Sequence, residues 1–570
     1  MLTATRVLAR AIITLGVALS LGACGGSGSG AGSTTNPPPP NPPPPNPPPA
    51  ATVDAPTDHA FVTDHFSGSE NCAVCHDGLN DAAGTDVSIV ADWQASMMAN
   101  SSRDPFWRAK VASEIRRNPG IASEIEATCS RCHAPMAHVE AIFATTEATL
   151  FDDGVLHPDN PLFDAAADGV SCTLCHQIED SAVLGTATGF SGGFEIPFNF
   201  GADRELYGQY ANPLQMPMVN QVAFTPVGSP HISESEVCAT CHNLSTPVVD
   251  ASGNLSGAFF PEQMVYTEWE NSGFTATQSC VSCHMQTVSG DVRIATRPMN
   301  GLNPRPDFSR HQFVGGNTYM LDLVARNSTE LQVTATGFET LVDETLNLLG
   351  TAASLDVEAV ARDGDDFVFT VRVTNLAGHK FPTSYPSRRA WLHVTVTDAA
   401  GAVVFESGAI DGAGRIAGVN SDADVTDYER HHRTISSSEQ VQVYETIMED
   451  QDSRLTYTLL EAASYRKDNR LLPNGMDKAA VPATIRPRGD AFTDPDFVDG
   501  GDLVDYRISG LNAGDMTIRA ELNYQVLTFA HAEDLFRDAE EPHVAAFQAL
   551  NASSGRRFET VSSVSQRFNF

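Results

Sequence analysis

The chain has 570 residues, of which 42% are hydrophobic and 19% are charged, as expected for a globular protein of two or three domains. Lys and Arg number 35 against 71 Asp and Glu, so the formal net charge is -36. This balance argues against nucleic-acid binding, because phosphate contacts need clustered cations, and against docking on anionic lipid. Only one apolar stretch approaches membrane length, which excludes an integral membrane protein with several helical spans.

That apolar stretch lies at the N-terminus and has the pattern of a secretory signal peptide over residues 1–23. Arg6 and Arg10 precede the apolar run 11–21. The small residues directly before Cys24 resemble a bacterial lipobox. The resemblance implies that the Cys24 thiol is acylated and that this lipid anchor is the only contact with a membrane. Cleavage nearby, with Cys24 as a free thiol, is the alternative.

Residues 24–57 have the composition of a linker. Gly and Ser dominate 25–32, and Pro dominates 36–50, which favours an extended polyproline II segment. A proline-rich recognition ligand is the competing interpretation. The position directly after an anchor favours a spacer that lifts the folded part away from the bilayer.

The other ten cysteines fall into five copies of the pentapeptide C-x-x-C-H. The pattern is the attachment signal of c-type haem: two thiols add to the two vinyl groups, and the adjacent His supplies one axial nitrogen to the iron. Zinc sites and redox-active C-x-x-C pairs do not require a His after every second cysteine, and five units do not pair evenly. We therefore predict five covalently bound haem c groups and no disulfide. The predicted attachment cysteines and axial histidines are Cys72, Cys75 and His76; Cys129, Cys132 and His133; Cys172, Cys175 and His176; Cys238, Cys241 and His242; Cys280, Cys283 and His284.

The five motifs are crowded into one stretch, from Cys72 to His284. So little polypeptide cannot build a separate core around each haem. We expect the porphyrins to form much of the core and to lie close to one another, as an electron-conducting array.

Residues 61–320 resemble the multihaem cytochromes c of the tetrahaem and pentahaem electron-carrier type. Four further segments are similar to those of a set of uncharacterised secreted cytochromes: DWQASMMAN (92–100), DGVSC (168–172), HQFVGGN (311–317) and GHKFPT (378–383). The resemblance implies electron transport at the cell envelope, in the periplasm or on either face of the outer membrane. It names no substrate.

The second axial position of each iron decides between a carrier and an enzyme, because a filled position transfers electrons and an open one binds a small molecule. His231 and His311 stand where similar cytochromes tend to place such ligands. Met98 lies where many relatives carry a ligating His, and His379 could reach a haem from the C-terminal half. A solvated or turn-bonded His, and a core-packing Met, are the alternatives. Three further histidines of the haem region, His65, His138 and His157, remain candidates.

No C-x-x-C-K motif occurs, so the resemblance to pentahaem nitrite reductases fails at their catalytic haem. An electron relay is therefore the first hypothesis for function. The second is a reductase of a small oxidised nitrogen or sulfur compound at one open haem. The third is a structural haem subunit of a larger conductive complex.

The predicted fold is α+β and multidomain: a mostly helical or irregular pentahaem domain over 58–352, then a β-sandwich-like domain over 353–570. Asp104 and Pro105 predict a helix start, and 338–350 is amphipathic. Alternating apolar residues predict strands around 367–373, 392–396, 403–405 and 518–526, and a final helix is expected over 532–550.

Positive charge is missing from one long segment, since no Lys or Arg occurs between Arg204 and Arg293. This acidic stretch predicts a docking face for a cationic redox partner, with general solubility as the alternative.

Overall fold

The computed structural model describes residues 55–298, 300–511 and 514–569. The predicted signal peptide, Cys24 and all but the last residues of the linker lie outside this part. The contacts of the chain gather the described residues into one compact unit. No helix among the described residues is both long enough and apolar enough to cross a bilayer.

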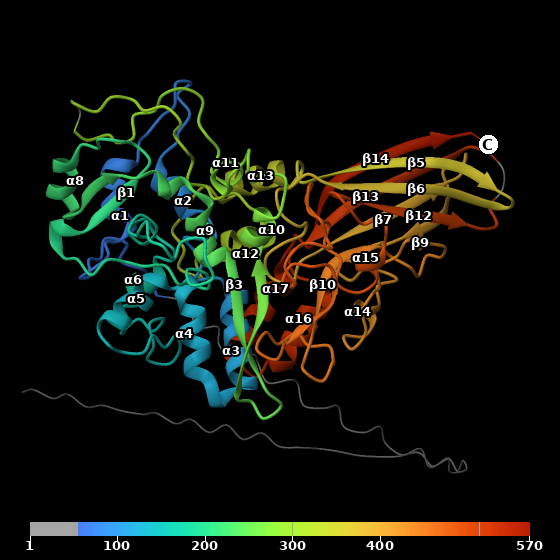
Figure 1. Ribbon diagram of the computed structural model, residues 1–570, viewed down its shortest axis with the longest axis horizontal. Coiled ribbons are helices and arrows are strands. Elements are labelled where there is room, and N and C mark those ends of the chain that lie inside the picture. Colours follow the sequence, from blue (N-terminus) through green and yellow to red (C-terminus); the bar gives the residue numbers. More distant parts are fainter. Residues whose placement is uncertain (1–54, 299, 512–513, 570) are drawn as a thin grey trace, which may run out of the picture. The chain divides into compact units, whose positions relative to one another are not determined.

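The first part of this unit, up to residue 350, consists of helices joined by long irregular segments (Figure 1). Two small two-stranded sheets interrupt them, β1 with β2 in parallel and β3 with β4 antiparallel. The helices are α1 (Ser69–His76), α2 (Ile89–Gln94), α3 (Pro105–Arg117), α4 (Ala122–His133), α5 (Pro135–Phe143), α6 (Phe163–Ala167), α7 (Cys172–Cys175), α8 (Gln215–Val222), α9 (Ser235–His242), α10 (Val265–Glu270), α11 (Cys280–His284), α12 (Thr318–Arg326) and α13 (Phe338–Leu349). The strands are β1 (Glu205–Gly208), β2 (Thr225–Gly228), β3 (Asn243–Val249) and β4 (Leu255–Met264).

Helix α3 begins where the sequence predicts. The Asp104 carboxylate accepts hydrogen bonds from the backbone N–H groups of Phe106 and Trp107, at 2.8 and 3.1 Å, and Pro105 occupies the first helical position. Side-chain oxygens in this position satisfy amide groups that the first turn leaves without a partner. The cap therefore fixes the start of the helix that presents Trp107 and Lys110 to the candidate site.

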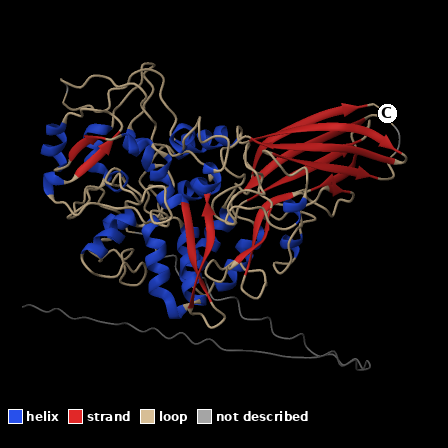
Figure 2. Ribbon diagram, viewed as in Figure 1, coloured by secondary structure: helices blue, strands red, loops and turns tan. Residues whose placement is uncertain are grey.

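From Ala353 onward the chain is mainly β-structure, shown in red in Figure 2. One sheet has the order β11-β10-β7-β13-β14, with β8 also paired to β7, and the other has the order β5-β6-β12-β9. The elements are β5 (Ala353–Asp363), β6 (Asp366–Asn375), β7 (Arg389–Thr397), β8 (Val403–Ser407), α14 (Asn420–Ala423), β9 (Thr434–Ile435), β10 (Val443–Glu449), β11 (Ser464–Asp468), α15 (Asp490–Thr493), β12 (Gly501–Ile508), β13 (Met516–Gln525), α16 (Phe529–Leu535), α17 (Pro542–Ser553) and β14 (Glu559–Phe568).

The two larger sheets share one apolar core. Phe369 and Val371 of the four-stranded sheet belong to the same buried cluster as Val394 and Ala520 of the six-stranded sheet. Burial alternates along β6, as the period-two pattern of its sequence predicts. The chain is thus α+β, as predicted, with a sandwich-like arrangement of strands in its second half.

The C-terminal end differs from the expected single helix over 532–550. Helix α16 ends at Leu535, and α17 begins at Pro542, which cannot donate the hydrogen bond that a continuous helix would need. The chain then returns as β14, which pairs with β13 along its length. The sequence analysis missed this strand because its exposed face is polar and weakly patterned.

Arg389 is the first residue of β7, and its guanidinium is buried beside the Asp422 carboxylate. The two nitrogen–oxygen distances are 2.8 and 2.7 Å, and both side chains are at most 1% exposed. Asp422 also accepts a hydrogen bond from the backbone N–H of Ile416. The pair therefore attaches the segment after β8 to the central strand of the larger sheet.

Asp422→Asn should lower the free energy of unfolding by about 3 kcal/mol, because it leaves the Arg389 charge buried without its partner. Chemical denaturation followed by circular dichroism measures the change. Asp366→Asn is the control, since Asp366 binds the exposed Arg507 and its loss should barely move the midpoint. Equal effects of the two substitutions would contradict the expectation.

Candidate functional site

Every C-x-x-C-H motif forms the end of a short helix. Helices α1, α4, α9 and α11 end at the motif histidine, and His176 caps α7. Residues three apart lie on the same face of a helix, so each turn presents its two thiols together and the histidine beside them. The local fold thus explains the fixed spacing of the pentapeptide.

Four of the five motif histidines have their Nδ1 within hydrogen-bond distance of a backbone carbonyl. A carbonyl can only accept, so Nδ1 carries the proton and Nε2 keeps its lone pair free to bind a metal. The acceptors are Ile294 for His76 at 2.8 Å, Ser101 for His133 at 3.2 Å, Tyr207 for His176 at 2.6 Å and Val314 for His284 at 2.5 Å.

Burial holds four of the five motif imidazoles neutral: His76, His133, His176 and His242. Burial lowers the pKa of His133 and of His242 to about 4, and lowers the pKa of His76 and His176 as well. A metal binds the neutral form of the ring, so protons do not compete with it near pH 7.

One connected cavity of about 1190 Å³ joins all five motifs. Its size exceeds that of an ordinary single-ligand pocket. Aromatic and aliphatic side chains such as Trp107, Phe224 and Leu321 contribute to its wall, and Arg297, Arg305 and Arg388 add positive charge. The wall includes every predicted attachment residue: Cys72, Cys75, His76, Cys129, Cys132, His133, Cys172, Cys175, His176, Cys238, Cys241, His242, Cys280, Cys283 and His284.

The lining fits haem. The apolar wall suits porphyrin faces, the arginines suit propionates, and the unprotonated Nε2 atoms suit iron. None of the ten described cysteines forms a disulfide, so every thiol remains able to react with a vinyl group.

Two imidazoles stand opposite motif histidines. The ring centre of His311 is 6.4 Å from that of His176, and the ring centre of His379 is 6.3 Å from that of His284. The ring planes are within 22° and 13° of parallel. A metal ion bound by two imidazole nitrogens, each about 2 Å away, would place the ring centres about 6 Å apart. These separations match a shared iron.

Both opposing rings have the protonation that a ligand needs. Nδ1 of His311 donates to the Ser309 carbonyl at 3.1 Å, and Nδ1 of His379 donates to the Lys380 carbonyl at 2.8 Å. Burial lowers the pKa of His311 to about 3 and also lowers that of His379. The geometry therefore favours His311 and His379 as the distal ligands of motifs three and five.

His231, the other main candidate, is placed differently. Its Nε2 donates to the Ile178 carbonyl at 2.9 Å, its Nδ1 lies 2.7 Å from the Ser229 hydroxyl, and it does not line the cavity. Both ring nitrogens are thus engaged within the protein. Met98 does line the cavity, so its predicted role as a ligand stays open as a prediction.

Thiols of different motifs lie against one another. Hydrogen bonding between thiols is the largest cause of the raised pKa of the first member of each pair, and burial adds to it. The pairs are Cys72 with Cys172, Cys132 with Cys241 and Cys238 with Cys280. Motif one therefore lies beside motif three, and motif four lies beside motifs two and five.

A polar niche interrupts the apolar wall near the second motif. Burial, with a smaller contribution from the Glu114 charge, raises the pKa of Glu262 to about 7, although a hydrogen bond from Gln263 and the charge of Lys110 act in the opposite direction. The hydroxyl of Tyr385 is buried without a hydrogen-bond partner, and the Glu262 charge acts on both Tyr385 and Cys129. The sequence analysis missed this niche; a Glu inside the apolar stretch of β4 was its only signal.

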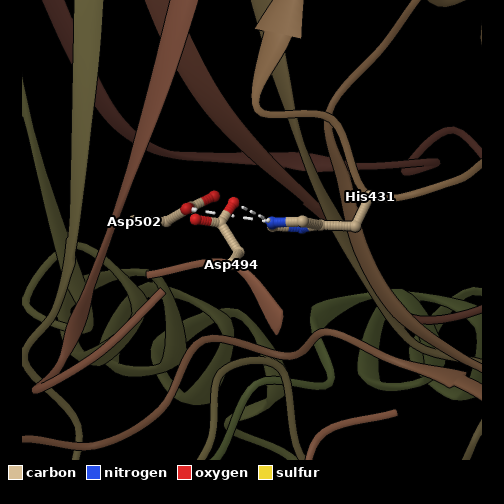
Figure 3. Close-up of side chains that lie close together, drawn as sticks. All are labelled: His431, Asp494 and Asp502. Atoms are coloured by element: carbon tan, nitrogen blue, oxygen red, sulfur yellow. Dashed lines mark hydrogen bonds and ion pairs between the residues drawn. The ribbon is translucent and has the colours of Figure 1, made fainter. Parts of the chain in front are cut away.

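A second cluster of possible metal ligands lies in the β-rich part. Figure 3 shows His431 facing Asp494 and Asp502, with Nε2 at 3.0 Å from Asp494 and 4.0 Å from Asp502. The side-chain amides of Gln442 and Asn469 both donate to Nδ1, and backbone partners fix the orientation of each amide.

Because Nδ1 accepts, the proton of His431 must sit on Nε2 and point to the carboxylates. The ring then offers no lone pair to an ion between Asp494 and Asp502. We conclude that this cluster is a buried hydrogen-bond network rather than a metal centre.

Comparison with solved structures places the fold in a known class. The chain is similar to a penta-heme cytochrome c552 from Thermochromatium tepidum, with a TM-score of 0.50 and 17% sequence identity. The alignment covers 88% of this chain and 99% of that one. The chain therefore has a multihaem cytochrome-like fold. No protein-family model matches it, and no curated protein matches it.

Replacing His311 or His379 by Ala should convert one haem from low-spin to high-spin, because each change removes one axial nitrogen. Electron paramagnetic resonance of the oxidised protein measures the conversion. His231→Ala is the matched control and should leave the spectrum unchanged. A loss of low-spin signal in the control, with none in the other two variants, would reverse the assignment.

Proposed function

We propose that this chain is a multihaem c-type cytochrome that transfers electrons through five covalently bound haems at the cell envelope. The observation that carries the proposal is the single cavity whose wall contains all ten motif cysteines and all five motif histidines. A protein that used these motifs for zinc would instead bring four ligands together at separate points. The multihaem cytochrome-like fold supports the same conclusion.

A bound haem supplies a one-electron iron centre, and the residues of the chain set its position and environment. The thiols tether each porphyrin at two points, and the backbone carbonyls orient the proximal imidazoles. The contacts between motifs favour a route that does not follow the sequence. Motif one lies beside motif three, and Cys175 of motif three acts electrostatically with Cys241 of motif four. Motif four then lies beside motifs two and five.

The proposed location is the cell envelope, with the protein held by acylated Cys24 and raised on the linker 24–57. This part of the proposal rests on the signal and lipobox pattern of the sequence. The proposed partners are other redox proteins, with a cationic docking face matching the segment between Arg204 and Arg293, which contains no Lys or Arg. A structural haem subunit of a larger complex would use the same anchor and array.

A second candidate function is reduction of a small oxidised nitrogen or sulfur compound at an open haem. The polar niche of Glu262 and Tyr385 beside the second motif favours it, because such reductions consume protons and a relay does not. Burial raises the pKa of Glu262 to about 7, and the charges of Glu114 and Lys110 also act on it. Within the described residues, His311 and His379 stand opposite the histidines of motifs three and five. At the second motif, Trp107 stacks on His133.

The mature protein should have a mass that exceeds its polypeptide by five haems, with lipid in addition. Intact mass spectrometry measures this directly. The double substitution of Cys72 and Cys75 by Ala should remove one haem and leave four. Zinc in place of haem, or fewer than five additions to the matured native chain, would disprove the proposal.

If the niche serves a reductase, Glu262→Gln should slow nitrite reduction about 100-fold, because it removes a general acid. In the native protein the rate should fall as the pH rises through about 7, where Glu262 loses its proton. Stopped-flow oxidation of the reduced protein by nitrite follows the reaction. Glu195→Gln is the control, because Glu195 is exposed on the surface. If the native protein does not reduce nitrite and its spectrum is entirely low-spin, the reductase hypothesis is wrong and electron relay remains as the proposed function.

A further inference from the structure

The ring that faces motif five comes from the β-rich part of the chain. His379 lies in the segment 376–388 between β6 and β7, whereas its counterpart His284 ends α11. The two ring centres are 6.3 Å apart, and both residues line the cavity. A loop between two strands must therefore be held firmly enough to keep an imidazole at this separation.

The residue after His379 begins a set of buried ions. Lys380 is fully buried, and its Nζ lies 2.7 Å from an Asp468 oxygen at the end of β11. The same carboxylate accepts two hydrogen bonds from Arg470, each at 2.9 Å. Arg470 in turn forms an ion pair with Glu268 of α10, with 2.8 Å between nitrogen and oxygen.

The set returns to the loop from which it started. The second oxygen of Glu268 accepts a hydrogen bond of 2.5 Å from the hydroxyl of Thr383. Lys380 and Thr383 thus hold the loop on both sides of a short turn, and the backbone of Phe381 makes two hydrogen bonds with Leu471, each at 2.9 Å. We call Lys380, Asp468, Arg470, Glu268 and Thr383 the ion ring.

The charges of the ion ring balance, with two cations against two anions, and all four side chains are at most 8% exposed. Although burial acts in the opposite direction, Arg470 and Lys380 lower the pKa of Asp468 to about 2. The Asp468 carboxylate therefore stays ionised at ordinary pH. Buried ions of this kind are costly unless every partner is present, so they define one geometry sharply.

We propose that the ion ring positions His379 opposite His284, so that the β-rich part of the chain sets the axial ligation of the fifth haem. Lys380, Asp468 and Thr383 are positioning residues, since they act through His379 and do not themselves face a motif histidine. The inference rests on the proposed function and adds to it a means by which one domain controls the potential of a haem in the other. Axial ligation is a main determinant of that potential.

The experiment uses the full chain with its haems and begins with Lys380→Met. We expect a high-spin electron paramagnetic resonance signal that accounts for no more than one of the five haems, because only the fifth haem loses its positioned ligand. All five haems should stay attached. Lys467→Met is the matched control, because Lys467 is also buried and lies next to Asp468, but it binds Glu445 and not the loop. The control should lose stability while every low-spin signal remains.

Thr383→Val covers the case in which Lys380→Met does not fold, because it removes one hydroxyl and no charge. It should shift the midpoint potential of one haem in a spectroelectrochemical titration. If His379→Ala changes the spin state while Lys380→Met and Thr383→Val behave as the native protein does, the positioning role is wrong and the ligand assignment stands. If His379→Ala also leaves the spectrum unchanged, the ligand assignment fails and the positioning role fails with it.

Discussion

The hydrogen bond between a motif histidine and a backbone carbonyl is the contact on which the arrangement of the cavity depends. It places the proton on Nδ1, orients the ring, and leaves Nε2 as the atom that can reach a metal. The acceptors Ile294 and Val314 lie in irregular segments and Tyr207 lies in β1, and each is at least 30 residues from its histidine in sequence. These distant segments are therefore part of the site, since they supply the carbonyls to which the motif histidines donate.

The β-rich part also supplies side chains to the wall of the cavity. It contributes His379, Tyr385 and Arg388 to the lining, all from the segment between β6 and β7. That segment is braced by β11 and by α10, one from each half of the chain. The β-rich part of the chain therefore belongs to the candidate site as much as the helical part does.

The sequence predicts the local features well and the long-range ones poorly. The five motifs, the cap at Asp104 and the alternating strands depend on residues within a few positions of one another, so spacing alone identifies them. The choice between His231 and His379 depends on which ring nitrogens are already engaged, and the partners Ile178 and Lys380 cannot be recognised from spacing. The pairing of Cys72 with Cys172 and the niche of Glu262 and Tyr385 likewise arise only when distant segments meet. Strand β14 was missed because its partner β13, rather than its own pattern, determines its conformation.

The ion ring has a consequence for the order in which the molecule can form. Lys380 and Asp468 are separated by 88 residues, and Thr383 and Glu268 by 115. Contacts of such high sequence separation form slowly, because the loops between them must close before the contact contributes any stability. The motifs are all complete by His284, well before Asp468 and Arg470 leave the ribosome. During biogenesis the fifth motif must therefore wait for β11 before the ion ring can close, and a chain interrupted in that interval would expose an incomplete motif to the solvent.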